Sequence, residues 1–429
     1  MKTVHIIGAG IAGLGAAHFL AAQGIQSVVY EASDHIGGRA AGSIEEGTLF
    51  EVGGKNFSSQ LPRFNALLKE FNIHEHDAQH PDFHIVLKDK LVRLDKSRTL
   101  SGDLRLAMQL GLRGSLQLKD FLGYSRKHAD ELNYTNGLIQ QVEQKWDHKP
   151  VSAHFAPSLV AGPMRMFSII MGAAEPEEVY PSLLTLFTAG FGKGQHFAIQ
   201  GGIQRFHQGL ANNKNIRLGE RVERIHIEQG KVTGLVVNGV DGEKRIDADA
   251  VISAVPAHVF KRLLVLPEQA QAACDSIRYF PLAMINARYD RPVFRDGVNS
   301  IMFEPGSVLG HCSANRLYQP ELVRFTLSGA AARKVLHQSD EALIALAEAE
   351  FSRRMPITGQ LVTARVTRHM GGICAYAPNF TRVKSQLLAG VDHIAGLAIA
   401  GDYLEGHTME GCLHSADLAS QRIGRYLAM

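Results

Sequence analysis

Apolar residues near the start of the chain change from a short continuous run to a helical spacing and back again. Residues 4–7 form an apolar run, residues 14–20 place apolar side chains at helical intervals, and residues 28–30 form a second run. Short runs predict buried strands, and the helical spacing predicts a helix between them. The order strand, helix, strand predicts a βαβ unit and therefore the α/β fold class.

Glycines occupy the turn that joins the first strand to the helix. The stretch GAGIAG places Gly8, Gly10 and Gly13 in the pattern G-x-G-x-x-G. The first glycine allows the tight turn, the second lets a pyrophosphate approach the backbone, and the third lets the helix pack close to the strand. Glu31 ends the second strand, where a carboxylate can accept hydrogen bonds from ribose hydroxyls. The pattern predicts dinucleotide binding and leaves NAD and FAD open.

A long helical pattern covers residues 101–133. Its apolar positions include Leu104, Met108, Leu112, Leu116 and Leu122. Two interpretations are open, a helix packed inside a substrate-binding domain and a helix lying on a membrane surface. The packed helix is favoured because the basic residues between the apolar ones are few and the core of a domain has to be filled.

The residues after Glu31 decide between the two cofactors. The chain continues as EASDHIGGRAAGS, with Gly37, Gly38 and Arg39, and then as FEVGGKNFSS. With these stretches it resembles the superfamily of flavin amine oxidases, protoporphyrinogen oxidases and phytoene desaturases. The resemblance implies a Rossmann-type FAD-binding domain of the glutathione-reductase-like family, discontinuous in sequence, with an inserted α+β substrate domain of mixed sheet and helices. The implied FAD-binding domain comprises residues 1–79, 196–260 and 366–429, and the substrate-binding domain residues 80–195 and 261–365.

Two later passages extend the resemblance. QGGIQRFHQGLA has the family's Gly-Gly pair before a helix, and the strand after it contains Val222, whose backbone meets the adenine in family members. IAGDYLEGHTMEG is similar to the end of phytoene desaturases, where the final helix directs its positive end at the flavin. The residues expected to bind FAD, without a covalent bond, are Gly8, Gly10, Ala12, Gly13, Glu31, Ala32, Gly38, Arg39, Gly53, Gly54, Val222, Gly401, Asp402, Met409 and Glu410.

Five side chains are candidates to line the active site. Tyr376 is the strongest of them, because an aromatic wall beside a flavin suits both amines and conjugated substrates. The other four are Lys55, Asn56, His196 and His407. Amine oxidases of the superfamily carry a lysine on the strand that reads YFPLAMINARYD here, and residues 282–287 contain none. This departure favours the desaturase and porphyrinogen-oxidase side of the superfamily.

The resemblance implies an FAD-dependent oxidase or desaturase that takes a hydride from a substrate C–H bond and is reoxidised by dioxygen or a quinone. A second strand-loop-helix nucleotide motif is absent from the sequence, so the organic substrate is expected to be the reductant. Three alternatives stay open: oxidation of a C–N bond, a non-redox flavoenzyme resembling UDP-galactopyranose mutase, and a prenyl-binding escort protein resembling GDP-dissociation inhibitors. Glu31, Arg39 and Asp402 argue against the escort protein, which has lost FAD.

Bulk composition excludes several other classes of protein. A formal net charge of +3 over 429 residues is too small to indicate nucleic-acid binding. The four cysteines form no C-x-x-C pair, and the histidine-rich stretch 74–84 fits no ligand spacing, so no metal is expected. No apolar run reaches the roughly 18 residues of a membrane span, and the expected location is the cytoplasm. The expected partner is a small-molecule substrate, apolar or amine-containing; peripheral membrane contact is not favoured, and the oligomeric state is open.

Overall fold

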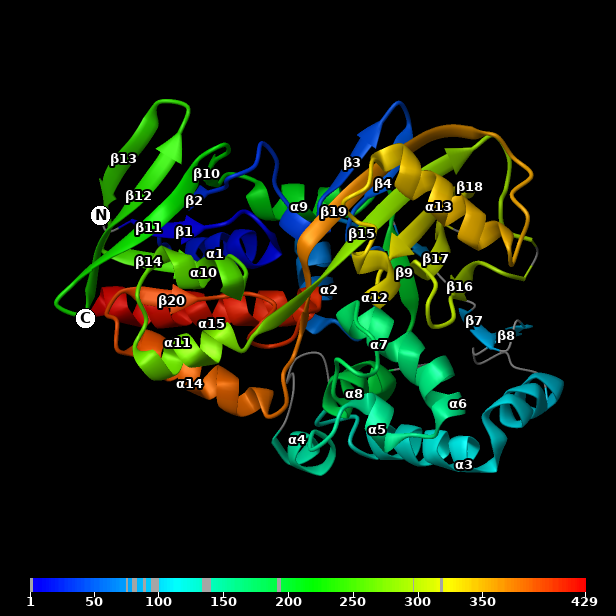
Figure 1. Cartoon of the computed structure of the whole chain (residues 1–429). Coiled ribbons are helices and arrows are strands. Elements are labelled where there is room, and N and C mark those ends of the chain that lie inside the picture. Colours follow the sequence, from blue (N-terminus) through cyan, green and yellow to red (C-terminus); the bar gives the residue numbers. More distant parts are fainter. Residues whose placement is uncertain are drawn as a thin grey trace.

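The computed structural model describes residues 3–74, 76–78, 83–87, 90–93, 100–132, 140–190, 194–295, 297–316 and 319–429. Two large sheets, each with its own helices, form the two halves of the molecule in Figure 1. This mixed arrangement of sheets and helices confirms the predicted α/β class.

The first half contains a five-stranded sheet in the order β10-β2-β1-β14-β20, in which every neighbouring pair is parallel. Its strands are β1 (Val4–Ile7), β2 (Ser27–Tyr30), β10 (Asn215–Arg217), β14 (Ala250–Ser253) and β20 (Leu397–Ile399). The strand-helix-strand prediction is confirmed, because α1 (Ile11–Ala22) connects the adjacent strands β1 and β2. Strands from both ends of the chain therefore meet in one sheet.

Both faces of this parallel sheet are buried. Ile6 and Ile252 pack in a core with α1 and the final helix α15 (Met409–Ala428), whereas Val251 and Leu397 pack in a second core. Parallel sheets are stable when helices cover both faces, which explains the continuous apolar runs in the sequence. Further elements of this half are α2 (Pro62–Glu70), α9 (Gln204–Ala211), α10 (Ala257–Leu263), α11 (Glu268–Asp275), α14 (Phe380–Asp392), and the antiparallel β11 (Arg221–Glu228), β12 (Lys231–Gly239) and β13 (Gly242–Asp247).

The second half contains a seven-stranded sheet in the order β19-β15-β18-β17-β16-β7-β8. Its strands are β7 (Phe83–Leu87), β8 (Lys90–Arg93), β15 (Arg278–Tyr289), β16 (Ser300–Met302), β17 (Leu309–Arg316), β18 (Gln319–Leu327) and β19 (Leu361–Ala375). Alternate residues of β15, among them Ala283 and Ile285, pack in one core with Leu343 and Phe351 of α13 (Asp340–Ser352). The shorter α12 (Ala330–Arg333) joins this layer.

A layer of helices lies below the second sheet in Figure 1. It consists of α3 (Leu100–Lys127), α4 (Gln140–Trp146), α5 (Val151–His154), α6 (Pro157–Leu159), the π-helical turn Val160–Met164, α7 (Arg165–Gly172) and α8 (Pro181–Gly190). Small strands complete the junction between the halves: β3 (Gly42–Glu45), β4 (Thr48–Glu51), β5 (Phe57–Ser58), β6 (His76–Ala78) and β9 (His196–Ile199), with the 3-10 turn Gly38–Ala40.

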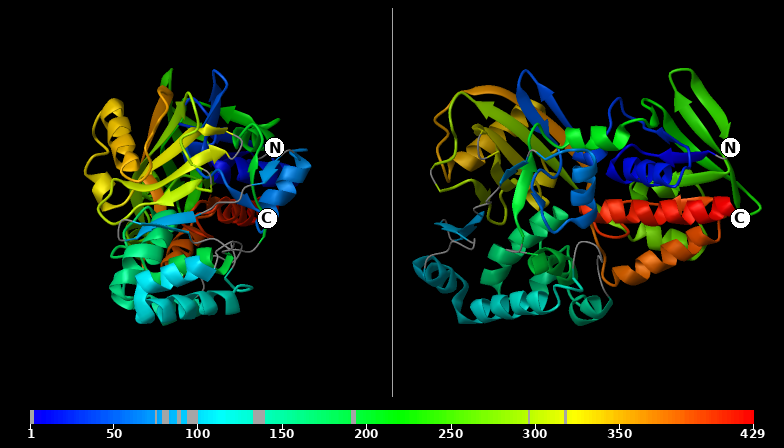
Figure 2. Two further views of the ribbon diagram at one scale, coloured as in Figure 1. Left: turned by 90° about the vertical axis from the view of Figure 1, so that its right-hand side faces the viewer. Right: turned by 180° about the vertical axis from the view of Figure 1, so that it is seen from behind.

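Two long antiparallel strands connect the halves. β15 and β19 pair from Arg278 opposite Ala375 to Tyr289 opposite Leu361 and run from the second sheet into the centre of the molecule. The views from the side and from behind show the same connection (Figure 2). The predicted division between residues 365 and 366 falls inside β19.

The long helix differs from expectation in the face that it buries. Four apolar residues that were expected to pack are exposed: Leu104, Met108, Leu112 and Leu116, together called the outer stripe. The buried face is instead formed by Leu106, Leu110 and Phe121. Because Gly111 has φ +71° and ψ 173°, it divides α3 into two helical segments. The prediction that the outer stripe fills the core is therefore wrong.

The described residues contain neither a helix that could cross a membrane nor a cluster of metal ligands. No helix among them combines the length and the apolar character that a membrane crossing needs. They also contain no group of three or more His, Cys, Asp or Glu side chains arranged to hold a metal ion; His80 of the histidine-rich stretch lies outside them. All four cysteines, Cys274, Cys312, Cys374 and Cys412, are buried and free.

Candidate active site

The glycine turn leaves open space at its centre and is tightly packed at its end. A Cβ atom on Gly13 would lie 1.9 Å from the carbonyl oxygen of Gly8, so the close approach of α1 to β1 requires glycine there. A Cβ atom on Gly10 would meet no protein atom within 4 Å. Gly38 runs directly alongside, since its Cβ would lie 3.3 Å from the Cα of Gly10. The space above Gly10 therefore fits a pyrophosphate that approaches the backbone.

The carboxylate of Glu31 is fixed at the end of β2. It accepts hydrogen bonds from the Ala9 backbone N–H at 2.7 Å, the Ser33 backbone N–H at 2.9 Å and the Ser33 hydroxyl at 2.8 Å. A carboxylate has about four acceptor positions, so capacity for a ribose hydroxyl is left. The neighbouring Ala32 is exposed, and Val222 is buried in β11, two residues after Glu220, whose N–H donates to the Glu31 carbonyl at 2.9 Å.

Arg39 and Asp402 form an ion pair at the junction of the two halves. Nη1 of Arg39 lies 2.8 Å from Oδ2 of Asp402 and also donates to the Gly372 carbonyl at 2.9 Å. The hydroxyl of Tyr279 donates to Oδ1 of Asp402 at 3.0 Å, and the guanidinium lies 5.4 Å from the Tyr279 ring centroid. Burial would lower the pKa of Arg39, but the Asp402 carboxylate more than offsets it, so the pKa is raised and the guanidinium stays charged.

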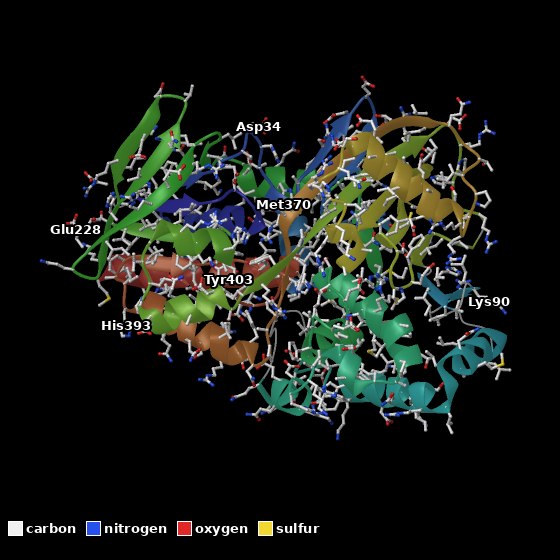
Figure 3. All side chains as sticks on the ribbon, viewed as in Figure 1. Asp34, Lys90, Glu228, Met370, His393 and Tyr403 are labelled. Atoms are coloured by element: carbon white, nitrogen blue, oxygen red, sulfur yellow. The ribbon has the colours of Figure 1, made fainter. Side chains whose placement is uncertain are left out.

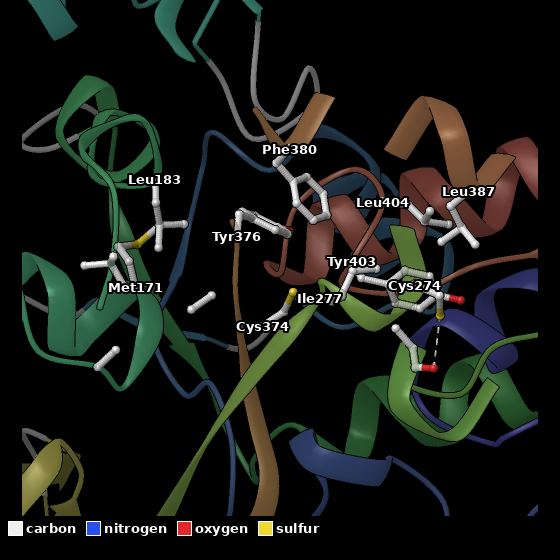
Figure 4. Close-up of a cluster of buried hydrophobic side chains, with 14 of the residues drawn as sticks. Met171, Leu183, Cys274, Ile277, Cys374, Tyr376, Phe380, Leu387, Tyr403 and Leu404 are labelled. Carbon is white, nitrogen blue, oxygen red and sulfur yellow. Dashed lines mark hydrogen bonds between the residues drawn. The ribbon is translucent and has the colours of Figure 1, made fainter. Parts of the chain in front are cut away.

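Tyr376 and Phe380 lie side by side and form an aromatic wall (Figure 4). Its hydroxyl donates to the backbone carbonyl of Asp402 at 2.5 Å, and its ring lies 4.2 Å from the Phe380 ring and 5.8 Å from that of His407. Burial lowers the pKa of His407 to about 4, so the imidazole is neutral at pH 7. The residues that line a small pocket here are Tyr376, Phe380, Thr381, Lys384, Leu404 and Gly406.

The final helix begins at Met409, as the sequence predicts. The Thr408 hydroxyl accepts a hydrogen bond from the Gly411 N–H at 3.2 Å and caps the helix. The Glu410 carboxylate is fully buried and accepts from the Phe64 N–H at 3.1 Å and from Arg63, so it stabilises the start of α2. Only the backbone of Glu410 is left for a cofactor, while the side chain of Met409 approaches Gly54.

The other three candidate active-site residues lie on two segments that meet where β5 pairs with β9. Lys55 is buried, and its ammonium donates to the Ala314 carbonyl on β17, so it joins the glycine-rich segment to the second sheet. Asn56 is exposed, and His196 lies at the start of β9, half-buried. The structure thus brings together Tyr376 and His407 but not the other three.

Several residues of the cluster have no motif that sequence analysis could have used. Tyr279 and His258 pack edge to face at 4.9 Å, and the His369 imidazole lies 2.7 Å from the Val52 carbonyl oxygen. Met370, on β19, is exposed at the junction (Figure 3). One indication of this cluster was available from the sequence, the aromatic residue Tyr279 near the start of β15.

Comparison with known proteins identifies the family. The sequence profile described as flavin containing amine oxidoreductase matches residues 11–424. The chain belongs to this family. It is 24% identical to 15-cis-phytoene desaturase of Synechococcus elongatus over 98% of this chain and 95% of that protein.

Solved structures of two amine oxidases have the same fold as this chain. Cyclohexylamine oxidase from Brevibacterium oxydans is 16% identical, with a TM-score of 0.76 and full coverage of both chains. Putrescine oxidase bound to putrescine is 17% identical, with a TM-score of 0.75 and coverage of 100% of this chain and 99% of that one. The protein is therefore an FAD-dependent oxidoreductase of the flavin amine oxidase superfamily.

The residues present fit FAD as the cofactor. The open space above Gly10 matches a pyrophosphate, and the anchored Glu31 carboxylate matches an adenosine ribose. Asp402 and the free N–H groups at the start of α15 lie at the other end of the same sheet edge, after β20. One elongated dinucleotide can span these two groups, since ligands bind at the carboxyl ends of parallel strands.

Proposed function

We propose that the protein oxidises a C–H bond of an apolar, conjugated small molecule, as a desaturase or oxidase. The observation that carries the proposal is the aromatic wall of Tyr376 and Phe380, joined to Asp402 through the Tyr376 hydroxyl. Flat rings pack favourably against a conjugated chain, and the segment Leu282–Ala287, which contains no lysine, favours such a substrate over an amine. Similarity to phytoene desaturase over nearly the whole chain supports the same reading.

The proposal assigns the two halves different tasks. The parallel sheet, with residues 1–79, 196–260 and 366–429, would bind FAD with the predicted cofactor residues. Residues 80–195 and 261–365 would bind the substrate. The FAD-binding half would be of the glutathione-reductase-like Rossmann type, and the location cytoplasmic. Bound FAD would supply the acceptor for the hydride, with dioxygen or a quinone as the final oxidant.

The residues of the cluster would orient the substrate and exclude water. Tyr376 is held by its bond to the Asp402 carbonyl, so its ring has a fixed position. Nδ1 of His407 has no hydrogen-bond partner among the described residues and the imidazole is neutral at pH 7, so this nitrogen is available for a hydrogen bond with the substrate. Arg39 and Asp402 would hold the centre of the cofactor, the guanidinium at the phosphates and the carboxylate at a ribityl hydroxyl.

The experiment is anaerobic mixing of the yellow holoprotein with conjugated polyenes and with primary and secondary amines. We expect the flavin absorbance to fall when a polyene is added and to stay unchanged when amines are added. Tyr376→Phe keeps the ring but loses the hydroxyl, whereas Tyr376→Ala loses the wall; the alanine variant should raise KM for a polyene at least about tenfold. Bleaching by amines alone would replace the proposal with C–N oxidation.

Oxidation of a C–N bond is the second candidate, supported by the fold shared with cyclohexylamine oxidase. Against it stands the segment Leu282–Ala287 of β15, which contains no lysine where amine oxidases of the superfamily carry one. A protein that needs prior reduction and consumes no dioxygen would indicate the mutase-like alternative. A colourless protein that cannot be reconstituted with FAD would indicate the escort protein.

A further inference from the structure

The outer stripe consists of four exposed apolar residues, two on each of the helical segments into which Gly111 divides α3. The exposed fractions are 62% for Leu104, 64% for Met108, 80% for Leu112 and 50% for Leu116. Leu104 and Met108 lie one helical turn apart before the bend at Gly111, and Leu112 and Leu116 lie one turn apart after it. Isolated exposed apolar residues are common, but a helical row of large ones marks an interaction surface.

Charge around the stripe is strongly positive. α3 contains five basic and two acidic residues, so its formal charge of +3 equals the net +3 of the whole chain. The basic residues exposed on the helix are Arg113, Lys119, Arg126 and Lys127. The remainder of the chain is electrically balanced, and the positive charge is concentrated next to the apolar stripe.

α3 lies along one edge of the molecule. In Figure 1 the longer part of α3 runs along the lower edge of the molecule, below α5, α6 and α8, and its first segment turns up toward β7 and β8. Leu106, Leu110 and Phe121 anchor its inner face in the core. The helix is thus held by the fold, while its outer stripe and basic residues face away from it.

We propose that α3 docks the protein on a membrane surface that carries anionic lipids. A helix with one apolar face and basic flanks lies in the plane of the lipid headgroups, where its apolar side chains enter the acyl boundary and its cations meet lipid phosphates. A second copy of the chain fits less well, because two-fold pairing across α3 would bring the same basic residues together. No described helix can cross a membrane, so the contact is peripheral.

Docking does not depend on the proposed substrate, since it can be measured with holoprotein and lipid alone. The test is sedimentation with vesicles of phosphatidylcholine alone and of phosphatidylcholine mixed with phosphatidylglycerol. Wild type should bind the anionic vesicles at least about tenfold more tightly, and added salt should weaken that binding. Failure of the wild type to bind anionic vesicles would overturn the proposal, whatever the enzyme oxidises.

Paired variants identify the surface. Met108→Asp with Leu112→Asp places charges in the outer stripe and should lower binding at least about tenfold. Val240→Asp with Val265→Asp is the matched control, because both valines are almost fully exposed and lie far along the chain from α3. Lys119→Gln with Lys127→Gln should lower binding to anionic vesicles and reduce its dependence on salt.

Each variant is checked for bound flavin and for its thermal unfolding temperature, which exposed substitutions should leave unchanged. If the aspartate pair is unstable, Leu104→Gln with Leu116→Gln tests the same surface with a smaller change. Equal lipid binding by the stripe variants and the control pair would refute the docking surface. A dimer in sedimentation that forms without lipid and is lost in the stripe variants would show that a second copy is the partner instead.

Discussion

Asp402 is held by three groups that come from distant parts of the chain. Its carboxylate receives Arg39 at 2.8 Å and Tyr279 at 3.0 Å, and its carbonyl receives the Tyr376 hydroxyl at 2.5 Å. The first of these partners is 363 residues away in sequence. The Asp402 side chain is 7% exposed and the Arg39 side chain 34% exposed, so the pair is partly buried and removal of one charge leaves the other less well compensated.

Asp402→Asn tests the pair. The amide keeps the size of the side chain but removes the charge opposite Arg39, so we expect stability to fall by roughly 2–3 kcal/mol and the affinity for FAD to fall about tenfold or more. Thermal unfolding of the apoprotein and FAD titration by fluorescence measure the two effects. Tyr279→Phe is the control, since it removes one hydrogen bond and keeps the ion pair; an equally large loss in both variants would contradict the central role of the charge.

Substitutions at Gly10 and Gly13 are expected to affect different properties, FAD affinity at Gly10 and the stability of the apoprotein at Gly13. Gly13→Ala would place a Cβ 1.9 Å from the Gly8 carbonyl oxygen, so we expect unstable apoprotein, whereas Gly10→Ala adds a Cβ to open space. Gly10→Ala should leave the apoprotein's unfolding temperature unchanged and weaken FAD binding by about tenfold or more, because the methyl group occupies the pyrophosphate approach. Full FAD affinity in Gly10→Ala would mean that the phosphates lie elsewhere.

Local patterns predicted the residues whose role depends on the chain next to them. Gly13 and Glu31 belong to one turn and the strand that follows, so their spacing alone indicates what they do. Lys55 belongs to a similar glycine-rich stretch, but its ammonium bonds to Ala314 in a distant strand. Spacing cannot direct a long side chain across 259 residues of sequence, so this contact was not predicted, and the place of Lys55 in the active site stays a prediction.

At the scale of elements, the positions of the helices were predicted better than the side that each helix buries. The start of α15 near Met409 was expected from the family resemblance, and in the structure the Thr408 hydroxyl caps the helix there. α3 was predicted as a helix over nearly its correct length, but its buried face was not. Its apolar residues occupy two faces, so periodicity alone allows either face to be the core, and the contacts of Phe121 decide it.

Gly111→Ala tests whether the bend in α3 depends on glycine. Gly111 has φ +71°, a conformation in which other residues are strained, so alanine should lower stability by about 1 kcal/mol. Gly123→Ala is the matched control on the same helix, because its Cβ would also meet no atom within 4 Å and its φ is not positive. Alanine there should raise stability by roughly 0.5–1 kcal/mol. Urea unfolding measures both; a stabilised Gly111→Ala would mean that α3 can straighten.

At the scale of the whole molecule, the order of the strands could be inferred from resemblance but the contacts between the halves could not. Strands β1 and β20 meet in one sheet although nearly 400 residues separate them, and only the similarity of both chain ends to one family indicated this. The two strands β15 and β19 that connect the halves have no distinctive sequence pattern, because their residues face different neighbours along their length. β19 is continuous across the domain boundary that was predicted between residues 365 and 366.

Buried histidines make the stability of the whole molecule depend on pH. Burial lowers the pKa of His207 and of His407 to about 4 and that of His311 to about 3, whereas in the unfolded chain each lies near its ordinary value of about 6.5. Between these limits the unfolded chain binds protons that the folded chain does not, so stability falls as the pH falls from about 6.5 toward 4. Asp147, whose pKa burial raises to about 7, opposes this trend.

His207→Phe, measured on the apoprotein, tests the pH dependence at a buried imidazole that packs against Gly37. Phenylalanine fills the buried space without a titrating group, so thermal unfolding temperature should fall less steeply between pH 7 and 4.5 than in wild type. For His207 the difference amounts to at most roughly 3 kcal/mol. His393→Gln is the control, because solvent already reaches this exposed ring in the folded state. An unchanged slope in His207→Phe would mean that this imidazole is protonated within the folded protein, and that acid acts on stability through other groups.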